Sequence, residues 1–439
     1  MDRSRVGITS EADTAVTVHS PLFDIVTAPP AASRKWFVVF LLSAGLAADY
    51  LARLGLYSIL PVLRRELIAT DLALGLFTAS FPWTYGILSP AAGYLGDRVP
   101  RRAVLILSIV GWSVATMLCA LAGSAWQLVA ARVLMATAQV AYMPAAQAAV
   151  ADLHSTASRA RASGLYQMGS YVGILMAGFP AAYVSTWLGW RTMLLLSGIV
   201  GLVLVPPLWR HLPHQTVGPV AGPADNGCIS TRQAFSLLRK PSLQALMLVF
   251  SLASMTYWVL FTYLPLFIYE HYRLSLESAA FQSTFYLQFS AMVLMPLFGT
   301  FSDRWARRGA RFRFLAFALT SLSGIPALLA IGVGHDIALL IAGLIIFGLV
   351  MAAGDASWLP MLCHVVLPHQ RATTYGILNA CGTLAGGLAA MATALVMKSV
   401  GLGLLIASLA AFFLLIAVVL LGIARWFLPR DLVVTGADT

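Results

Sequence analysis

Charged side chains are scarce in this chain. Asp, Glu, Lys and Arg together make up 10% of its 439 residues, whereas a soluble domain carries about 25%. Such a composition cannot cover a surface that faces water on all sides. Because 59% of the residues are hydrophobic, the sequence excludes an ordinary soluble protein and indicates that lipid is the main solvent of the fold.

Acidic residues and cysteines are also few. Seventeen acids stand against 28 Lys and Arg, which gives a net charge of +11. An excess of base can mark a nucleic-acid-binding protein, but these bases lie in short segments between apolar runs, as membrane orientation requires. We therefore expect no nucleic-acid partner. The four cysteines show no metal-ligand or redox spacing, so the sequence predicts neither a metal site nor a cofactor.

Signatures of enzymes are missing as well. The chain has no G-x-x-x-x-G-K-[ST] phosphate-binding loop, no H-E-x-x-H zinc motif and no G-x-S-x-G nucleophile elbow. We expect a protein that is not an enzyme and is not driven by ATP.

Long apolar runs are what the chain has instead. A membrane-spanning helix needs roughly 20 mainly apolar residues. Twelve such runs follow one another: 36–60, 73–95, 102–121, 125–150, 160–187, 191–209, 243–269, 278–301, 312–332, 336–360, 371–397 and 402–427. We expect a disordered cytoplasmic tail over 1–35, an N-terminal half over 36–209, a Pro- and Gly-containing cytoplasmic linker over 210–242, a C-terminal half over 243–428 and a cytoplasmic tail over 429–439.

The basic residues predict the orientation of these runs. If both chain ends are cytoplasmic, 21 of the 28 Lys and Arg lie in cytoplasmic segments, five in outer loops, and Arg53 and Arg132 within the membrane. This asymmetry favours a multi-pass protein of the cell inner membrane with both termini inside.

The two halves repeat each other. The turn Gly93–Arg102, G-Y-L-G-D-R-V-P-R-R, recurs as Gly299–Arg308, G-T-F-S-D-R-W-A-R-R, and places Asp97 and Asp303 206 residues apart. Three further pairs share a spacing: Arg53–Pro61 with Tyr257–Pro265, Gln139–Pro144 with Asp355–Pro360, and Gly164–Gln167 with Gly376–Asn379. These features predict an all-α membrane protein with twelve transmembrane helices in two pseudo-symmetric six-helix halves, a plan that transporters use to build a central cavity.

The repeated turn resembles the signature between helices 2 and 3 of the major facilitator superfamily, and its copy lies where that superfamily has its second. A finer resemblance, to the anion:cation symporter family of organic-anion carriers (phthalate permease-like), rests on four stretches. These are Arg53-x7-Pro61, Leu165-Tyr166-Gln167 with Gly169 and Gly173, Leu188-Gly189-Trp190-Arg191, and Tyr375-Gly376 with Asn379, Gly382 and Gly386-Gly387. Spinster-like carriers share part of the pattern of helices 1 to 4.

Two positions depart from the symporter family. Ala52 stands where that family usually has an acid before the arginine of helix 1, and Gln139 stands where it usually has a glutamate in helix 4. The resemblance associates those acids with proton coupling, so proton coupling through these two positions is not expected in this chain.

Asp49 and Asp355 are the two acids in the middle of apolar runs, and an ionisable residue there indicates a functional site. Asp49 precedes Arg53 by four residues, so both lie on one helix face. In the functional interpretation Arg53 receives the anionic group of the substrate, and Asp49 is its partner in the empty carrier and a candidate for proton coupling that takes a proton when the substrate competes for Arg53. In the structural interpretation the two residues only neutralise each other. Asp355 is the repeat counterpart of Gln139, and we expect either a relocated proton site or a structural acid that bonds helix ends or Ser357.

Neutral polar and aromatic residues complete the predicted site. The candidates for substrate binding are Arg53, Tyr57, Tyr85, Gln139, Gln167, Tyr257, Trp258, Gln288 and Asn379. Helix–helix hydrogen bonding is the alternative for the amides, and a lipid-facing position is the alternative for the aromatic residues. The candidates for gating or structure are Gly93, Asp97, Arg98, Arg101, Arg102, Arg132, Asp303 and Arg304. The resemblance implies that the charged turns hold the halves together on the cytoplasmic side and so favour an outward-open state.

The sequence as a whole predicts a monomeric secondary transporter that imports a small organic anion, a carboxylate or sulfonate, with protons. Export of amphipathic compounds or Spinster-like lipid transport is the second transporter hypothesis, and a non-transporting membrane receptor or scaffold is the alternative of another class. The substrate, the direction and the coupling stoichiometry are left open.

Overall fold

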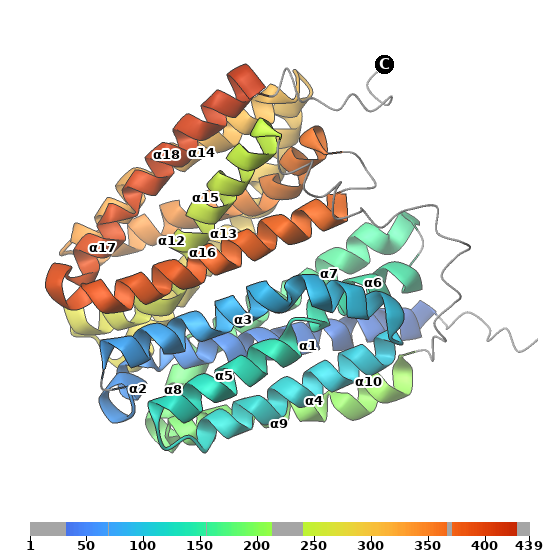
Figure 1. Cartoon of the computed structure of the whole chain (residues 1–439), viewed down its shortest axis with the longest axis vertical. Coiled ribbons are helices and arrows are strands. Elements are labelled where there is room, and N and C mark those ends of the chain that lie inside the picture. The colour runs from blue at the N-terminus through green and yellow to red at the C-terminus, as the bar shows by residue number, and fades with distance from the viewer. Residues whose placement is uncertain (1–31, 69, 155, 213–239, 367–370, 428–439) are drawn as a thin grey trace, which may run out of the picture.

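The computed structural model describes residues 32–68, 70–154, 156–212, 240–366 and 371–427, and the regular elements in these ranges are all helices. The C-terminal tail and nearly all of the N-terminal tail and linker predicted above lie outside the described residues. The helices form two bundles that lean against each other (Figure 1).

The N-terminal bundle is built from the described residues between 32 and 212. Its helices are α1 (Ala32–Ser58), α2 (Leu60–Glu66), α3 (Asp71–Arg98), α4 (Arg101–Ala120), α5 (Ala125–Gln139), α6 (Tyr142–Leu153), α7 (Thr156–Ala177), α8 (Phe179–Leu188), α9 (Trp190–Val203) and α10 (Val205–His211).

The C-terminal bundle follows the linker. Its helices are α12 (Pro241–His271), α13 (Leu276–Ala306), α14 (Arg311–Val333), α15 (Ile337–Val365), α16 (Arg371–Val400), α17 (Leu402–Ser408) and α18 (Ala410–Gly422), which continues into the π-helical turn η2 (Ile423–Phe427).

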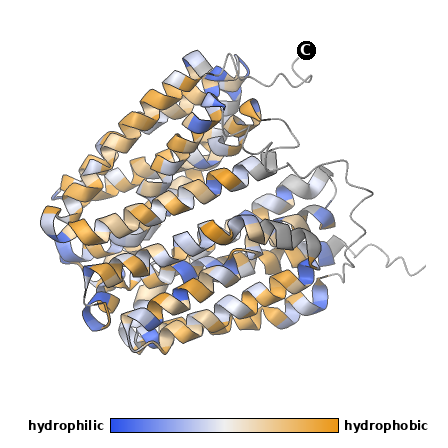
Figure 2. Cartoon of the chain, viewed as in Figure 1, coloured by the Kyte–Doolittle hydropathy of each residue, from blue (hydrophilic) through white to orange (hydrophobic). Residues whose placement is uncertain are grey.

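Among the described residues, eleven of the twelve predicted runs coincide with segments that are long and apolar enough to cross a membrane. Each of these segments is a single helix or a nearly continuous pair of helices. The remaining run, 73–95, forms α3, which at 28 residues is also long enough. Its apolar pattern is interrupted by Thr78, Ser80 and Thr84, whose hydroxyls bond to backbone carbonyls of their own helix. Figure 2 shows hydrophobic residues along most of the helix lengths and hydrophilic ones gathered mainly at helix ends.

The internal repeat is visible in the turns. The backbone enters α9 through Gly189 with φ 84° and enters α17 through Gly401 with φ 87°. Residues with a side chain rarely adopt a backbone conformation with positive φ, so both turns require glycine. The repeated prolines lie in different settings in the two halves: Pro61 is in the first turn of α2, just after the break that follows α1, whereas its counterpart Pro265 lies inside the continuous α12.

The bundles meet along α3 and α16. Figure 1 shows these helices side by side near α2 and α17 and diverging toward the ends of the chain. The indole nitrogen of Trp83 donates to the carbonyl of Leu384 at 3.3 Å. At Gly387 a Cβ atom would lie 2.5 Å from Cδ1 of the same indole, so glycine permits the close approach. We call the side where Ala32 and Phe427 lie the terminus side and the opposite side the far side.

Ion pairs join the bundles on the far side. Arg64 of α2 pairs with Glu270 of α12 at 3.1 Å, and Lys398 of α16 pairs with Asp71 of α3 at 2.9 Å. Glu66 accepts a hydrogen bond from the indole of Trp190 at 2.8 Å, which fixes α2 to the N-terminal bundle. Exposed pairs contribute at most about 1 kcal/mol each, so they select a geometry more than they stabilise it.

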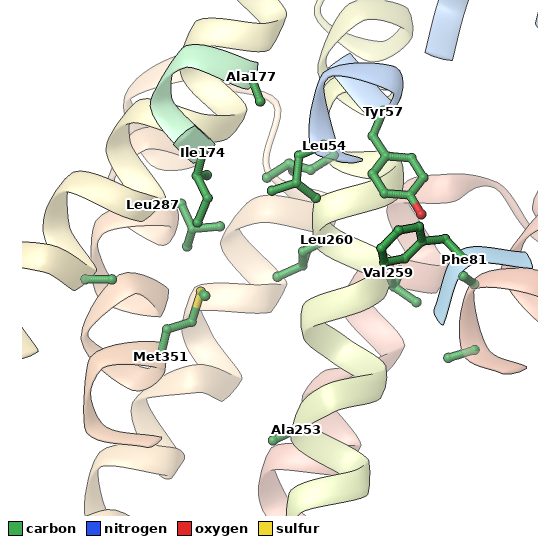
Figure 3. Close-up of a cluster of buried hydrophobic side chains, with 14 of the residues drawn as sticks. Leu54, Tyr57, Phe81, Ile174, Ala177, Ala253, Val259, Leu260, Leu287 and Met351 are labelled. Carbon is green, nitrogen blue, oxygen red and sulfur yellow. The ribbon is translucent and has the colours of Figure 1, made fainter. Parts of the chain in front are cut away.

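Apolar packing seals the space beneath these ion pairs. Figure 3 shows side chains from both bundles in one cluster, among them Leu54 and Ile174 from the N-terminal bundle and Leu260, Leu287 and Met351 from the C-terminal one. All five are buried. The structure is therefore closed on the far side.

The close contact at Gly387 leads to a prediction. Gly387→Ala places a methyl group against the indole of Trp83, which must shift, and overpacking of this kind costs about 1–3 kcal/mol. We expect a lower melting temperature for the purified protein. Gly376→Ala on the same helix is the matched control, because nothing lies within 4 Å of the added Cβ. Equal melting temperatures for the two variants would contradict the contact.

Candidate functional site

A cavity of about 280 Å³ lies between the bundles. Its lining comes from α1, α3, α5 and α6 in the first half and from α12 and α16 in the second. The lining residues are Leu46, Asp49, Tyr50, Arg53, Leu54, Tyr85, Gln139, Tyr142, Met143, Ser254, Tyr257, Trp258, Phe261, Tyr375, Asn379 and Thr383. Six of the nine predicted substrate-binding residues are therefore brought together: Arg53, Tyr85, Gln139, Tyr257, Trp258 and Asn379.

Arg53 and Asp49 form the charged centre of this cavity. Nη2 of Arg53 lies 3.8 Å from Oδ2 of Asp49, and the two side chains are 12% and 8% exposed. An ion at the centre of a membrane helix costs about 2.5–3.5 kcal/mol even on insertion scales. Pairing one turn apart on α1 offsets part of this cost and keeps the guanidinium at the cavity wall.

Aromatic rings orient the Arg53 guanidinium. Its carbon lies 4.1 Å from the ring centre of Tyr50 and 5.4 Å from that of Phe81, distances at which a cation is attracted to the ring face. Its Nε is buried and has no hydrogen-bond partner among the described residues. The side chain is thus held in place with one donor left unused.

Two further polar atoms of the lining are buried and unpaired within the described part of the chain, Oε1 of Gln139 and the hydroxyl of Tyr257. The amide nitrogen of Gln139 donates to the backbone carbonyl of Asp49 at 3.3 Å. An unpaired buried polar atom costs about 1–3 kcal/mol. A ligand with hydrogen-bonding groups would satisfy these atoms, together with Nε of Arg53.

Asp355 lies near the cavity but outside its lining. Its side chain is exposed, and the side chains of Tyr171, Tyr257 and Tyr375 lie within range of its charge, although none of them is hydrogen-bonded to it. Tyr171 belongs to α7 of the N-terminal bundle, so Asp355 faces the space between the bundles. The described side chains provide no ion-pair partner for it within 4 Å.

Three predicted substrate-binding residues lie outside the cavity lining. Tyr57 points toward Arg132, Gln167 is half-buried on α7, and Gln288 lines a separate space of about 20 Å³ beside Leu54. The sequence shows that these helices carry polar groups but does not show the rotation of each helix.

Arg132 is a fully buried cation with a structural environment. Its Nη2 donates to the hydroxyl of Tyr57 at 2.6 Å, and its guanidinium carbon lies 4.8 Å from the ring centre of Phe77. The Tyr57 hydroxyl donates to the carbonyl of Thr78 at 3.3 Å, and the Thr78 hydroxyl shares a 3.1 Å hydrogen bond with Tyr263 of the other bundle. A chain of hydrogen bonds thus links Arg132 to the opposite half.

The charged turns make contacts within their own bundle. Arg101 pairs with Asp152 and donates to the carbonyl of Ala148 at 3.2 Å, and Arg102 stacks on Trp209 at 4.2 Å. These contacts differ from the expected bridge between the halves, because the bundles are apart on the terminus side in this structure. Arg304 is exposed. For four other predicted residues the structure describes the backbone alone: Gly93, Asp97, Arg98 and Asp303.

Several lining residues were not predicted from sequence. They include Tyr50, Tyr142 and Phe261, which look like ordinary apolar-face residues in the sequence. Tyr375 and Thr383 lie on the same helix face as the predicted Asn379, at i−4 and i+4, and this spacing was a signal that could have identified them. No group of three or more potential metal ligands occurs in the part of the chain that the structure describes.

Comparison with known proteins agrees with this geometry. The family model described as Major Facilitator Superfamily matches residues 42–389. The chain belongs to this superfamily. The hexuronate transporter of Escherichia coli strain K12 is 23% identical over 88% of this chain and 93% of its own length. The gallate transporter of Pseudomonas putida is 32% identical over 28% of this chain and 27% of its own.

A solved structure of the superfamily shows the same fold. A bacterial homologue of the human lysosomal transporter Spinster, in an inward-facing and unoccupied conformation, superposes with a TM-score of 0.79 at 20% identity. The alignment covers 92% of this chain and 99% of that one. Like its relatives in the superfamily, the present chain divides its twelve membrane helices between two bundles.

The two tyrosine hydroxyls lead to a prediction. Tyr57→Phe leaves a donor of the buried Arg132 unpaired, which costs about 1–3 kcal/mol, so the melting temperature should fall. Tyr257→Phe is the matched control, because its hydroxyl has no partner among the described residues, and we expect an unchanged or higher melting temperature. Thermal unfolding of both purified variants measures the difference, and the reverse order would refute this assignment.

Proposed function

We propose that this chain is a secondary active transporter that imports a hydroxylated carboxylate across the cell inner membrane together with protons. The observation that carries the proposal is Arg53, a guanidinium with an unused donor in a cavity that both bundles line. A planar guanidinium suits a carboxylate, which it can bind through two parallel hydrogen bonds.

The rest of the lining supports a substrate with hydroxyl groups. Hexuronate and gallate, named for two relatives, are both carboxylates that carry hydroxyls. The unpaired atoms of Gln139 and Tyr257 offer hydrogen bonds to such groups, and Asn379 and Thr383 add further polar contacts. The rings of Tyr85 and Trp258 can pack against a sugar or aromatic ring.

In the empty carrier, the carboxylate of Asp49 pairs with Arg53 in place of the substrate carboxylate. The 3.8 Å separation from Arg53 is longer than a charge-assisted hydrogen bond of about 2.7–2.9 Å, so the pair is loose. A substrate carboxylate competes for the same guanidinium. Binding then exchanges one anion partner for another and leaves no uncompensated charge in the membrane.

Asp355 is the residue that we assign to proton coupling. It occupies the repeat position of Gln139, where the acid of the symporter family is missing, and it faces the space between the bundles. A carboxylate without an ion-pair partner can take up a proton without breaking a salt bridge. Protonation neutralises the carboxylate and so lowers the free-energy cost of moving it within the membrane when the bundles rock.

Transport follows from alternating access around this cavity. The contacts at Arg64–Glu270 and Lys398–Asp71 close the far side, which we take to face outward, while the terminus side faces the cytoplasm. Rocking of the bundles would break these contacts and bring the charged turns together. The two halves of one chain form the whole site, so a monomer suffices.

Arg53 gives the direct test. In proteoliposomes, Arg53→Ala should reduce uptake of galacturonate or gallate at least about 30-fold, because loss of a buried charge contact costs 2 kcal/mol or more. Arg53→Lys should retain part of the activity, since it keeps the positive charge but lacks the planar guanidinium that binds a carboxylate through two parallel hydrogen bonds. Arg65→Ala, at an exposed arginine on α2, is the control and should transport normally.

Two outcomes would overturn this assignment. Full uptake by a folded Arg53→Ala variant would rule out the anion site and favour a carrier of amphipathic or lipid-like compounds. Binding of these acids without translocation by the wild-type chain would identify a receptor.

Asp355 gives the second test. Asp355→Asn should abolish the stimulation of uptake by an inward proton gradient but preserve exchange of labelled for unlabelled substrate, which needs no net proton movement. Asp49→Asn should instead alter substrate affinity, because it frees Arg53. Unchanged gradient stimulation in Asp355→Asn would be incompatible with this proton site.

A further inference from the structure

A second depression lies on the membrane-facing side of the C-terminal bundle, away from the transport cavity. Its volume is about 320 Å³. The walls come from the end of α13, the turn between α13 and α14, the first half of α14 and the second half of α18. The lining residues are Trp305, Arg308, Phe312, Leu315, Ala318, Leu319, Leu322, Ala417 and Leu421. We call this depression the α14–α18 groove.

The groove is polar at one end only. Arg308 and Trp305 lie at the terminus side, and the wall from Phe312 to Leu322 is apolar. Phe312 and Leu322 are ten residues apart on α14, a distance of about 15 Å at 1.5 Å per residue. This distance is half the thickness of a hydrocarbon core of about 30 Å. The apolar part therefore matches the depth of one membrane leaflet.

The polar end is strongly basic. Arg308 is exposed, and the described side chains include no ion-pair partner for it within 4 Å. Arg311 stacks on Phe312 at 5.0 Å, so a second cation is held at the mouth of the groove. Trp305 packs against Phe301 at 4.8 Å and places an amphipathic ring at the same level, where membrane headgroups lie.

We propose that the α14–α18 groove binds one anionic phospholipid from the leaflet on the terminus side. An acyl chain lies along Leu315, Leu319 and Leu421, and the phosphate of the headgroup lies against Arg308. Charge complementarity selects the occupant, because the ammonium group of a zwitterionic headgroup offsets the attraction of its phosphate to the two neighbouring arginines, whereas an anionic headgroup has no such group. The lipid joins α14 to α18, the outer helices of this bundle.

The test is thermal unfolding of the full-length protein in detergent, titrated with phosphatidylglycerol or with phosphatidylcholine of the same acyl chains. Phosphatidylglycerol should raise the melting temperature at lower concentrations than phosphatidylcholine does. Arg308→Gln should weaken its apparent affinity roughly fivefold, the effect of one basic side chain near an anionic lipid. Arg307→Gln is the matched control: this neighbour is exposed but does not line the groove, and the affinity should stay the same.

A second pair of variants tests the apolar part without changing charge. Leu319→Trp fills the groove and should remove the difference between the two lipids. Leu329→Trp lies at another exposed position of α14 and should preserve it. Equal stabilisation of the wild-type protein by both lipids, or equal loss in Arg308→Gln and Arg307→Gln, would overturn the proposal.

Discussion

The pairing of Arg53 with Asp49 at membrane depth is the constraint around which this molecule is arranged. Neither charge can face lipid, so the face of α1 that carries both of them must look into protein or into a water-accessible cavity. Tyr50 and Phe81 cover the guanidinium, and Gln139 bonds to the backbone of Asp49. These protein contacts surround the charged pair only in part. The remaining side of the Arg53 guanidinium borders the cavity between the bundles, where an anion can bind.

A chain of buried hydrogen bonds leads from Arg53 to the contact between the bundles. Arg132 lies behind Arg53 and donates to its backbone carbonyl at 3.4 Å. From Arg132 the hydrogen bonds pass through Tyr57 and Thr78 to Tyr263, whose hydroxyl donates to the α16 backbone. Buried polar groups, which have few alternative partners, therefore connect the backbone at Arg53 with α3 and α16.

The sequence contained most of the architecture and about half of the site. The membrane runs were readable because lipid imposes one length and one composition on each span. The partnership of Asp49 and Arg53 was readable because i, i+4 spacing places both on one face. The positions of Tyr57 and Gln288 were not, since helix rotation depends on packing between helices distant in sequence. The same holds for Arg64 and Glu270, which were ordinary loop charges until the fold brought them together.

Spin-label distances between the bundles, measured with and without substrate, test the central claim most directly. Labels at 65 and 273 report the far side, and labels at 161 and 308 report the terminus side. The empty protein should show a short far-side distance and a long terminus-side distance. Galacturonate or gallate should add a population with the opposite pattern, and Arg53→Gln should remove that population. Distances that do not respond to either acid, or that respond equally in Arg53→Gln, would contradict alternating access controlled by this arginine.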